Sequence, residues 1–473
     1  MHKHLTTLTC TVLCASALNA ADVPQWGAGP NRNMVNTVEK GLPTEWDIKS
    51  GKNIKWSVKL GSQSYGNPVI ADGSVFVGTN NEGGYDPEVK GDKGNILCFA
   101  EKDGAFLWQA VHDKLSAGRV NDWPYQGICS TICIEGDRGW YLNNRCEVVC
   151  ISTRGMADGK NEGVQDETYS GAKKADVIWR YDMIEELGVF PHNLATSSPI
   201  VHGDLVFVVT GNGVDEGHLN LPSQVSPSFA AFNKKTGELA WEYAVEDRIL
   251  HGQWSSPSIG IVNGKAQVIF PGGDGWVYSL DAATGELVWK FNCNPVDTTW
   301  ELGGYGTKNN LIATPVVLDD KVYIGVGQDP EHGNGTGHLY AIDATGKGDV
   351  TQSHQAWHLG GDDFGRTMST VAIHEGLLYV SELSGVLFCI EAATGKVIWK
   401  HDQQASVWGS SMVVDGHLYI GDEDGDVTVL EQGRELKVIN TINMGESVYT
   451  TPTAANGVLY ITTKSHLYAI VSE

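Results

Sequence analysis

One phrase recurs along this chain: a strand-like apolar stretch, a turn carrying Thr-Gly, and a second strand-like stretch that ends in tryptophan. Segments 231–241 (AFNKKTGELAW), 279–289 (SLDAATGELVW) and 389–399 (CIEAATGKVIW) show it most clearly, and segment 98–108 repeats it with Asp103 in place of the threonine. A unit that recurs in this way is the sequence signature of a repeat architecture, in which neighbouring copies bury one another's faces.

A second phrase precedes each copy: a doublet of small polar residues, usually a proline, and an alternating apolar run, as in segments 197–213 and 313–327. Alternation with period two predicts short strands, and the intervening Asp-Gly and Asn-Gly turns predict hairpins. We therefore expect an all-β fold, an eight-bladed β-propeller of four-stranded antiparallel blades. The eight copies of the second phrase start at residues 66, 129, 197, 255, 313, 369, 410 and 451.

The strand-like segment NIKWSVKL (53–60) stands alone before the first copy, so it should pair with the C-terminal strands and close the ring without an exposed sheet edge. We expect one propeller over residues 51–473. The tryptophans at the ends of the outer strands should dock between blades: Trp56, Trp108, Trp179, Trp241, Trp289, Trp357 and Trp399.

The A-x-D-x-x-T-G-x-x-x-W pattern resembles the tryptophan-docking repeat of the quinoprotein alcohol dehydrogenase-like superfamily. That resemblance implies an eight-bladed propeller. It also implies one of two functions: a dehydrogenase with pyrroloquinoline quinone (PQQ) and calcium, or a cofactor-free scaffold such as the lipoprotein of the outer-membrane barrel-assembly machinery. Asn212 matches the family's metal-binding Thr-Gly-Asn phrase, but Gly273 occupies the position of a cofactor-binding arginine, and Asp247 follows Glu246 rather than a tryptophan. The sequence also lacks the adjacent Cys-Cys pair of many such enzymes.

Composition limits the compartment and the partners. A formal net charge of -24 argues against a nucleic-acid partner. Residues 1–20 have the basic start, apolar stretch and small residues of a signal peptide, followed by an extension at 21–50, so we expect an exported monomer in the periplasm or outside the cell. No later apolar run is long enough for a transmembrane segment, and without a C-x-x-C-H motif we expect no haem.

Three loops are much longer than their counterparts, at 79–95, 211–228 and 325–343, and all should lie on one face of the ring. Within or beside the latter two are candidate metal or cofactor ligands: Asn212, Asp215, His218, Asp329, His332 and His338. The connections between blades on that face supply candidate ligand-binding residues, with Lys308 and Arg366 as possible anchors for an anion. These are Trp123, His192, His251, Trp254, Tyr305, Lys308, Arg366, Trp408 and Tyr449.

A further insertion, residues 152–179, should lie on the opposite face as a solvated flap, with partner docking as the alternative. We therefore expect a ligand- or partner-binding scaffold in the cell envelope. The first alternative is a quinoprotein-type oxidoreductase with PQQ and calcium, and the second is an enzyme that acts on a saccharide.

Overall fold

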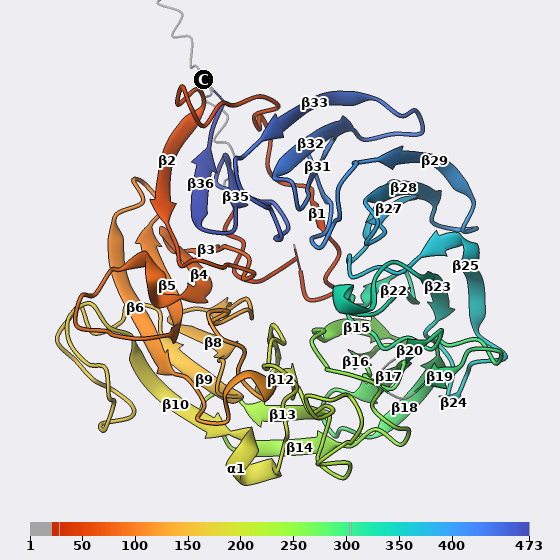
Figure 1. The fold of residues 1–473 in the computed structure, drawn as a ribbon, viewed down its shortest axis with the longest axis horizontal. Helices are drawn as coiled ribbons and strands as arrows, with labels where there is room; N and C mark the ends of the chain where they lie inside the picture. The colour runs from red at the N-terminus through yellow and green to blue at the C-terminus, as the bar shows by residue number, and fades with distance from the viewer. Residues whose placement is uncertain (1–20, 28, 302, 304, 473) are drawn as a thin grey trace, which may run out of the picture.

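The computed structural model describes residues 21–27, 29–301, 303 and 305–472, and it contains eight four-stranded antiparallel blades around a central axis (Figure 1). The predicted all-β, eight-bladed propeller is confirmed. The predicted signal peptide, residues 1–20, lies outside the described residues.

The first four blades follow the chain in order, each running from the axis outward. Their strands are β3 (Val69–Ala71), β4 (Ser74–Asn80), β5 (Lys93–Ala100) and β6 (Phe106–Asp113); β7 (Cys133–Glu135), β8 (Arg138–Leu142), β9 (Glu147–Ser152) and β10 (Asp176–Asp182); β11 (Ile200–His202), β12 (Leu205–Val209), β13 (Phe229–Asn233) and β14 (Leu239–Tyr243); and β15 (Ser258–Val262), β16 (Lys265–Pro271), β17 (Trp276–Asp281) and β18 (Leu287–Asn292).

Blades 5 to 7 repeat the pattern, and blade 8 takes its outermost strand from the start of the propeller. Their strands are β21 (Val316–Leu318), β22 (Lys321–Val326), β23 (Thr336–Asp343) and β25 (Gln355–Gly365); β26 (Ala372–His374), β27 (Leu377–Ser381), β28 (Val386–Glu391) and β29 (Val397–Asp402); β30 (Met412–Val414), β31 (His417–Gly421), β32 (Asp426–Glu431) and β33 (Val438–Asn443); and β34 (Thr453–Ala455), β35 (Val458–Thr462), β36 (His466–Ile470) and β2 (Ile54–Lys59).

The remaining elements are short. They are β1 (Val35–Asn36), β19 (Trp300–Glu301), β20 (Tyr305–Gly306), β24 (Gly348–Asp349), α1 (Met183–Leu187), η1 (Asn81–Gly83), η2 (Gly118–Val120) and η3 (Pro330–His332). Within the described ranges, no helix is both long and apolar enough to span a membrane.

The ring closes as predicted: β2 pairs antiparallel with β36, so strands from the two ends of the propeller share one blade. The core consists of eight hydrophobic clusters, and each lies between two neighbouring blades. Because every blade buries both faces against its neighbours, the propeller is held together by contacts that no single blade could make alone.

The docking tryptophans pack as predicted. The ring of Trp241 lies over Gly285 of the following blade, where an added Cβ would come within 2.6 Å of the indole, and its Nε1 donates to Ala282 O at 3.2 Å. Gly285 has φ +74°, which explains why a glycine recurs in the turn. The seven cysteines in the described part of the chain are free, and six of them are buried.

The insertion between β9 and β10 is largely exposed, as expected of a solvated flap, but its C-terminal end is anchored to the preceding blade. Lys174 forms a parallel bridge with Gln109, on the outermost strand of blade 1, and its ammonium group pairs with Asp86. In blade 5, β24 likewise pairs in parallel with β18, the outermost strand of blade 4. Excursions between the third and fourth strands therefore cover the outer edge of the preceding blade, where unpaired backbone groups would otherwise be exposed.

A segment that we call the N-terminal strap, residues 23–27 and 29–36, lies inside the ring (Figure 1). Its backbone or side chains form hydrogen bonds at the innermost strand of every blade or just before it. The contacts are Val23 with Ile70, Pro24 with Ile134, Arg32 with Ser198 and Pro199, Pro30 with Ile259, Asn31 with Val317, Asn33 with Ile373, Met34 with Val413 and Asn36 with Ala454.

Arg32 fixes the strap. Its side chain is fully buried and donates to four carbonyl oxygens, those of Trp26 (2.7 Å), Ser198 (2.8 Å), Pro199 (3.0 Å) and Pro257 (3.1 Å). Burial lowers the pKa of the guanidinium to about 10, so the group stays charged at neutral pH. The strap thus runs inside the ring and is hydrogen-bonded to all eight blades.

Candidate functional site

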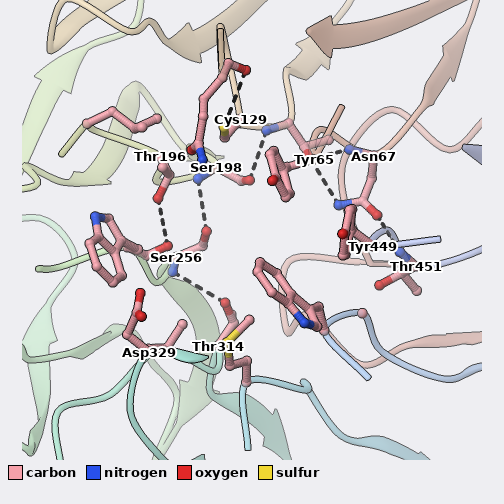
Figure 2. A pocket seen from close by; sticks show the side chains of 18 of the residues that line it. Tyr65, Asn67, Cys129, Thr196, Ser198, Ser256, Thr314, Asp329, Tyr449 and Thr451 are labelled. Carbon is pink, nitrogen blue, oxygen red and sulfur yellow. Dashed lines mark hydrogen bonds between the residues drawn. The ribbon is translucent and has the colours of Figure 1, made fainter. Parts of the chain in front are cut away.

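The small polar residue two positions before each innermost strand takes part in a closed ring of hydrogen bonds around the channel, part of which is drawn in Figure 2. The N–H of Ser198 donates to Ser256 Oγ at 2.9 Å, and each equivalent N–H donates to the side chain of the next blade in the same way. The ring runs Asn67, Thr131, Ser198, Ser256, Thr314, Thr370, Ser410, Thr451 and back to Asn67. The polar doublet of the repeat therefore links each blade to the next through a hydrogen bond.

Above this ring lies a cavity of about 330 Å³, which we call the cup. Trp26 of the strap is among its lining residues, as are seven of the eight ring residues. Asp329 and Glu331 from the long loop of blade 5 are also among the lining residues, so the cup lies toward the long-loop face.

Aromatic side chains form much of the wall (Figure 2). Tyr65 stacks on Tyr449 with ring centroids 5.3 Å apart, and Trp408 lies 4.8 Å from Tyr449. Trp123 and Trp254 also line the cup. Of the predicted ligand-binding residues, Trp123, Trp254, Trp408 and Tyr449 thus face one cavity.

The charged groups of the lining are all acidic. Asp329 and Glu331, from the long loop of blade 5, line the cup, and no lysine or arginine is among the described lining residues. Burial raises the pKa of Asp329 to about 6. The described lining of the cup therefore offers aromatic faces, hydroxyl groups and carboxylates, and it contains no lysine or arginine side chain to hold an anionic ligand.

Behind Trp254, four histidines converge. His192 and His251 are buried and come from connections between blades, whereas His218 and His332 come from the long loops of blades 3 and 5. The His218 and His251 ring centroids lie 4.4 Å apart, His192 and His251 4.6 Å apart, and His251 and His332 5.0 Å apart. One nitrogen from each of His192, His218 and His251 lies within 4.8 Å of the other two.

Two of the four histidines were expected elsewhere. His192 and His251 were assigned to the rim of the channel as ligand-binding residues, but they lie at 0% and 2% exposure among the other imidazoles. His338, in contrast, does not join His218 and His332. It lies in β23, where its Nδ1 is 3.1 Å from Nε2 of His358.

Arg366 was predicted to be able to anchor an anion, and the structure corrects this. Its guanidinium is buried and donates to His332 O at 2.7 Å, Gly306 O at 3.3 Å and Asn309 Oδ1 at 3.2 Å. These bonds hold the long loop of blade 5 against the preceding connection. Lys308 is half-buried, and Tyr305 is 67% exposed and lies outside the lining of the cup.

Asn212 and Asp215 maintain the long loop of blade 3. Asn212 Oδ1 accepts from Phe190 N at 3.0 Å, and its Nδ2 donates to Ser223 O at 2.8 Å. Asp215 accepts from the N–H of Leu219 at 2.9 Å. The Asn212 side chain therefore ties the long loop of blade 3 to the connection that precedes this blade, whereas the Asp215 carboxylate bonds within the loop itself.

The residues do not fit PQQ and calcium. The amide of Asn212 is the one match to the family's metal-binding phrase, and its oxygen and nitrogen are already hydrogen-bonded to the backbone of Phe190 and Ser223. A Cβ at Gly273, where the family has an arginine, would lie 2.6 Å from Gln253 Cγ, so the side chain of Gln253 occupies the space next to this position. PQQ is a tricarboxylate, and the cup has no basic side chain among its described lining residues to hold it.

Sequence reasoning missed two parts of the site. The strap was assigned only as an extension at 21–50, because its contacts do not repeat with any period in the sequence. The ring of hydrogen bonds did have a signal, the polar doublet before each blade, but the doublet alone does not say where its hydroxyl groups point.

Comparisons with known proteins are consistent with this fold. A family model described as outer membrane protein assembly factor BamB matches residues 166–352 and 335–437, which together exceed half of the chain. Tetrathionate hydrolase of Acidithiobacillus ferrooxidans is 26% identical over 183 residues. That match covers 36% of this chain and only 32% of the relative's length.

Two solved structures share the architecture. BamB from Moraxella catarrhalis has a TM-score of 0.58 at 14% identity, over 88% of this chain and 98% of that chain. The quinohemoprotein alcohol dehydrogenase ADHIIG from Pseudomonas putida HK5 has a TM-score of 0.52 at 14% identity, over 87% of this chain and 76% of that chain. At these identities the likeness shows the fold alone, because one propeller can carry unrelated functions.

Proposed function

The chain belongs to the family described as outer membrane protein assembly factor BamB, and from this premise we propose that it is a binding propeller whose cup holds an uncharged or cationic organic molecule. The observation that carries the proposal is the composition of the cup: aromatic walls, a ring of hydroxyl groups and two carboxylates, with no basic side chain among the described lining residues.

The aromatic wall suits a ligand with an apolar face. Tyr65, Trp408 and Tyr449 form one contiguous cluster, and Trp254 lines the same cavity. Rings of this kind stack on sugar rings and attract cations over their faces, at about 0.5–2 kcal/mol per contact. The hydroxyl groups lower on the wall supply hydrogen bonds for the polar edge of such a molecule.

Charge argues against the ligands of the enzymes that share features with this chain. PQQ and tetrathionate are both anions, and Asp329 and Glu331 would repel them within the cup. Since the positions expected to hold PQQ and calcium do not fit that group, the proposal is of binding and not of quinoprotein oxidation.

Titration of the intrinsic tryptophan fluorescence tests the proposal. Maltose and choline represent an uncharged and a cationic ligand, and PQQ with calcium and tetrathionate are the anionic comparisons. We expect a saturable change with maltose or choline and with other members of a library of uncharged and cationic fragments. Saturable binding of the anions alone, or no response to any of these compounds, would contradict the proposal.

We place the protein in the cell envelope, on the basis of the leader-like sequence at residues 1–20. Fractionation of cells that express the full chain should recover the protein, shortened after residue 17 or 20, with the periplasmic or secreted material. Recovery of the uncut chain with the cytoplasm would contradict this placement.

Partner docking on the long-loop face is the second candidate. The loops of that face expose large apolar side chains to water, and exposed apolar side chains gathered on one face are typical of a protein-binding surface. They are Tyr125, Leu219, Val225, Val296 and Tyr305. A photo-crosslinking residue at position 225 should yield a discrete protein adduct in cells, which the same residue at Lys102, an exposed position in a blade 1 turn, should not.

A further inference from the structure

We propose that His192, His218 and His251 bind a divalent transition-metal ion of the class that prefers imidazole ligands, with His332 beside them as a fourth imidazole. The inference does not rest on the ligand proposed for the cup. It rests on the arrangement of the imidazoles, their hydrogen bonds and their burial.

The spacing of the nitrogens fits a metal ion. Metal–nitrogen bonds of about 2.0–2.1 Å in tetrahedral geometry place ligand nitrogens about 3.4 Å apart. His218 Nε2 and His251 Nε2 face each other at 3.1 Å, and the nitrogens of His192, His218 and His251 all lie within 4.8 Å of one another. Small rotations of the rings therefore suffice to bring three nitrogens to bonding distance from one ion.

The hydrogen bond of His192 orients its ring as in metal sites. Its Nδ1 lies 2.8 Å from Val214 O, and because a carbonyl oxygen only accepts, Nδ1 carries the proton. The lone pair is then on Nε2, which is buried without a hydrogen-bond partner. A ligating histidine that donates its other N–H to a backbone carbonyl is the usual outer-shell arrangement of protein metal sites.

A further ring nitrogen is left without a partner. His332 Nε2 is also buried with no hydrogen bond, as His192 Nε2 is. A buried polar atom without a partner costs on the order of 1–3 kcal/mol, so two such nitrogens in one cluster favour a bound ligand.

The donor set selects the class of metal. Three or four imidazoles without a thiolate suit Zn²⁺, Cu²⁺ or Ni²⁺, and the lack of carboxylate ligands disfavours Ca²⁺ and Mg²⁺. Burial lowers the pKa of His192 to about 4 and that of His251 well below its usual range, so both are neutral at neutral pH, as a ligand must be.

The cluster adjoins the cup through Trp254. The indole Nε1 donates to His192 O at 3.0 Å, and the ring lies 5.0 Å from His251. Trp254 also lines the cup. A bound ion would therefore stiffen one wall of the cup, and a paramagnetic ion would quench the fluorescence of this tryptophan.

Metal binding to the untagged, chelator-treated full chain tests the proposal. We expect one Zn²⁺ per chain by calorimetry and by elemental analysis, competed by Cu²⁺ and Ni²⁺. Cobalt(II) should give the visible absorption of a tetrahedral nitrogen site. Substoichiometric or unsaturable zinc binding, or calcium bound more tightly than zinc, would overturn the site.

Variants locate the ion. His218→Ala, in a half-buried loop position, should weaken zinc binding by about 100-fold or more, by analogy with the 10–100-fold effect of outer-shell partners. His358→Ala removes an imidazole from the separate pair with His338 and should leave the affinity unchanged. If His218→Ala unfolds, His218→Gln replaces it.

The two readouts separate this inference from the proposed function. Zinc binding with no response to maltose, choline or the fragments would support the metal site and contradict the ligand proposed for the cup. Equal zinc affinities of the wild type, His218→Ala and His358→Ala proteins would show that the four histidines are only a hydrogen-bonded packing cluster.

Discussion

The backbone N–H of Thr451 donates to Asn67 Oδ1 at 2.8 Å and so joins the last blade to the first, 384 residues away in the sequence. It is one of eight equivalent hydrogen bonds that circle the channel, and Asn67 is the one ring residue that is neither serine nor threonine. Closure of the propeller thus has two components: the pairing of β2 with β36 at the outer edge, and this ring at the axis.

Replacement of Asn67 by alanine should destabilise the propeller. The change leaves the buried N–H of Thr451 without an acceptor, which costs on the order of 1–3 kcal/mol. Asn67→Ser introduces the residue that serves this position in blades 3, 4 and 7, and it should restore part of the loss. Urea unfolding followed by fluorescence measures both free energies, and equal stabilities of the wild type and Asn67→Ala would show that the ring is dispensable.

The contribution of the Trp241–Gly285 contact to stability can be measured separately from that of the left-handed glycine backbone. Gly285 and Gly264 both have φ +74°, but an added Cβ meets the Trp241 indole at 2.6 Å only at Gly285, and open space at Gly264. Both alanine variants carry the left-handed backbone cost of about 1–2 kcal/mol. Gly285→Ala should lose a further ~1–3 kcal/mol of unfolding free energy, because the added methyl group overpacks against the indole. Urea unfolding compares the two variants. Equal losses in both would mean that the Trp241 indole moves aside without an energetic cost.

The strap should depend on Arg32. Arg32→Met removes the donors to four carbonyl oxygens and should reduce the free energy of unfolding by on the order of 3 kcal/mol. The strap should then become sensitive to limited proteolysis while the blades stay resistant. Arg434→Ala, which removes an exposed ion pair with Glu391, is the matched control and should change stability by less than about 0.5 kcal/mol. A strap equally protected in both variants would exclude this anchoring role.

Much of the fold could be predicted because it repeats. The Thr-Gly-x-x-x-Trp phrase and the alternating runs recur in register, and the structure places Trp241 and its equivalents where that register requires. The strap could not be predicted in this way, since Val23, Arg32 and Asn36 reach different blades through different kinds of contact.

The site was harder to predict from the sequence than the fold, because loops from separate blades meet there. His218 and His332 were recognised as candidates from their long loops, but their meeting with His192 and His251 depends on how four connections fold against one another. His338 was grouped with them by sequence proximity, yet it lies on a strand and contacts His358. Arg366 was expected to be free to bind an anion, whereas backbone carbonyls of the neighbouring loop accept its hydrogen bonds.

The buried carboxyl group of Asp274 should make stability depend on pH. Burial raises its pKa to about 7, so the folded state holds a proton that the unfolded chain releases near pH 4. Its contribution is fully present below pH 4 and is lost as the pH rises through 7, with a slope approaching about 1.4 kcal/mol per pH unit. Asp274→Asn should remove this slope, and the difference in unfolding free energy between variant and wild type, measured from pH 4 to 8, isolates it. A difference that stays constant over this range would show that Asp274 does not titrate there.

The cup should bind its ligand more weakly when an aromatic side chain of its wall is removed. Trp408→Ala removes the ring 4.8 Å from Tyr449, and loss of one stacking contact of about 1.4 kcal/mol weakens binding tenfold. Maltose or choline, whichever binds the wild type, is the probe in a calorimetric titration. Trp300→Ala is the matched control, because that indole stacks on Arg248 in a neighbouring connection and does not line the cup. If both variants bind the ligand as tightly as the wild type, the ligand does not stack on Trp408. If both variants lose affinity equally, the loss comes from a general disturbance of the connections between blades and not from the aromatic wall of the cup.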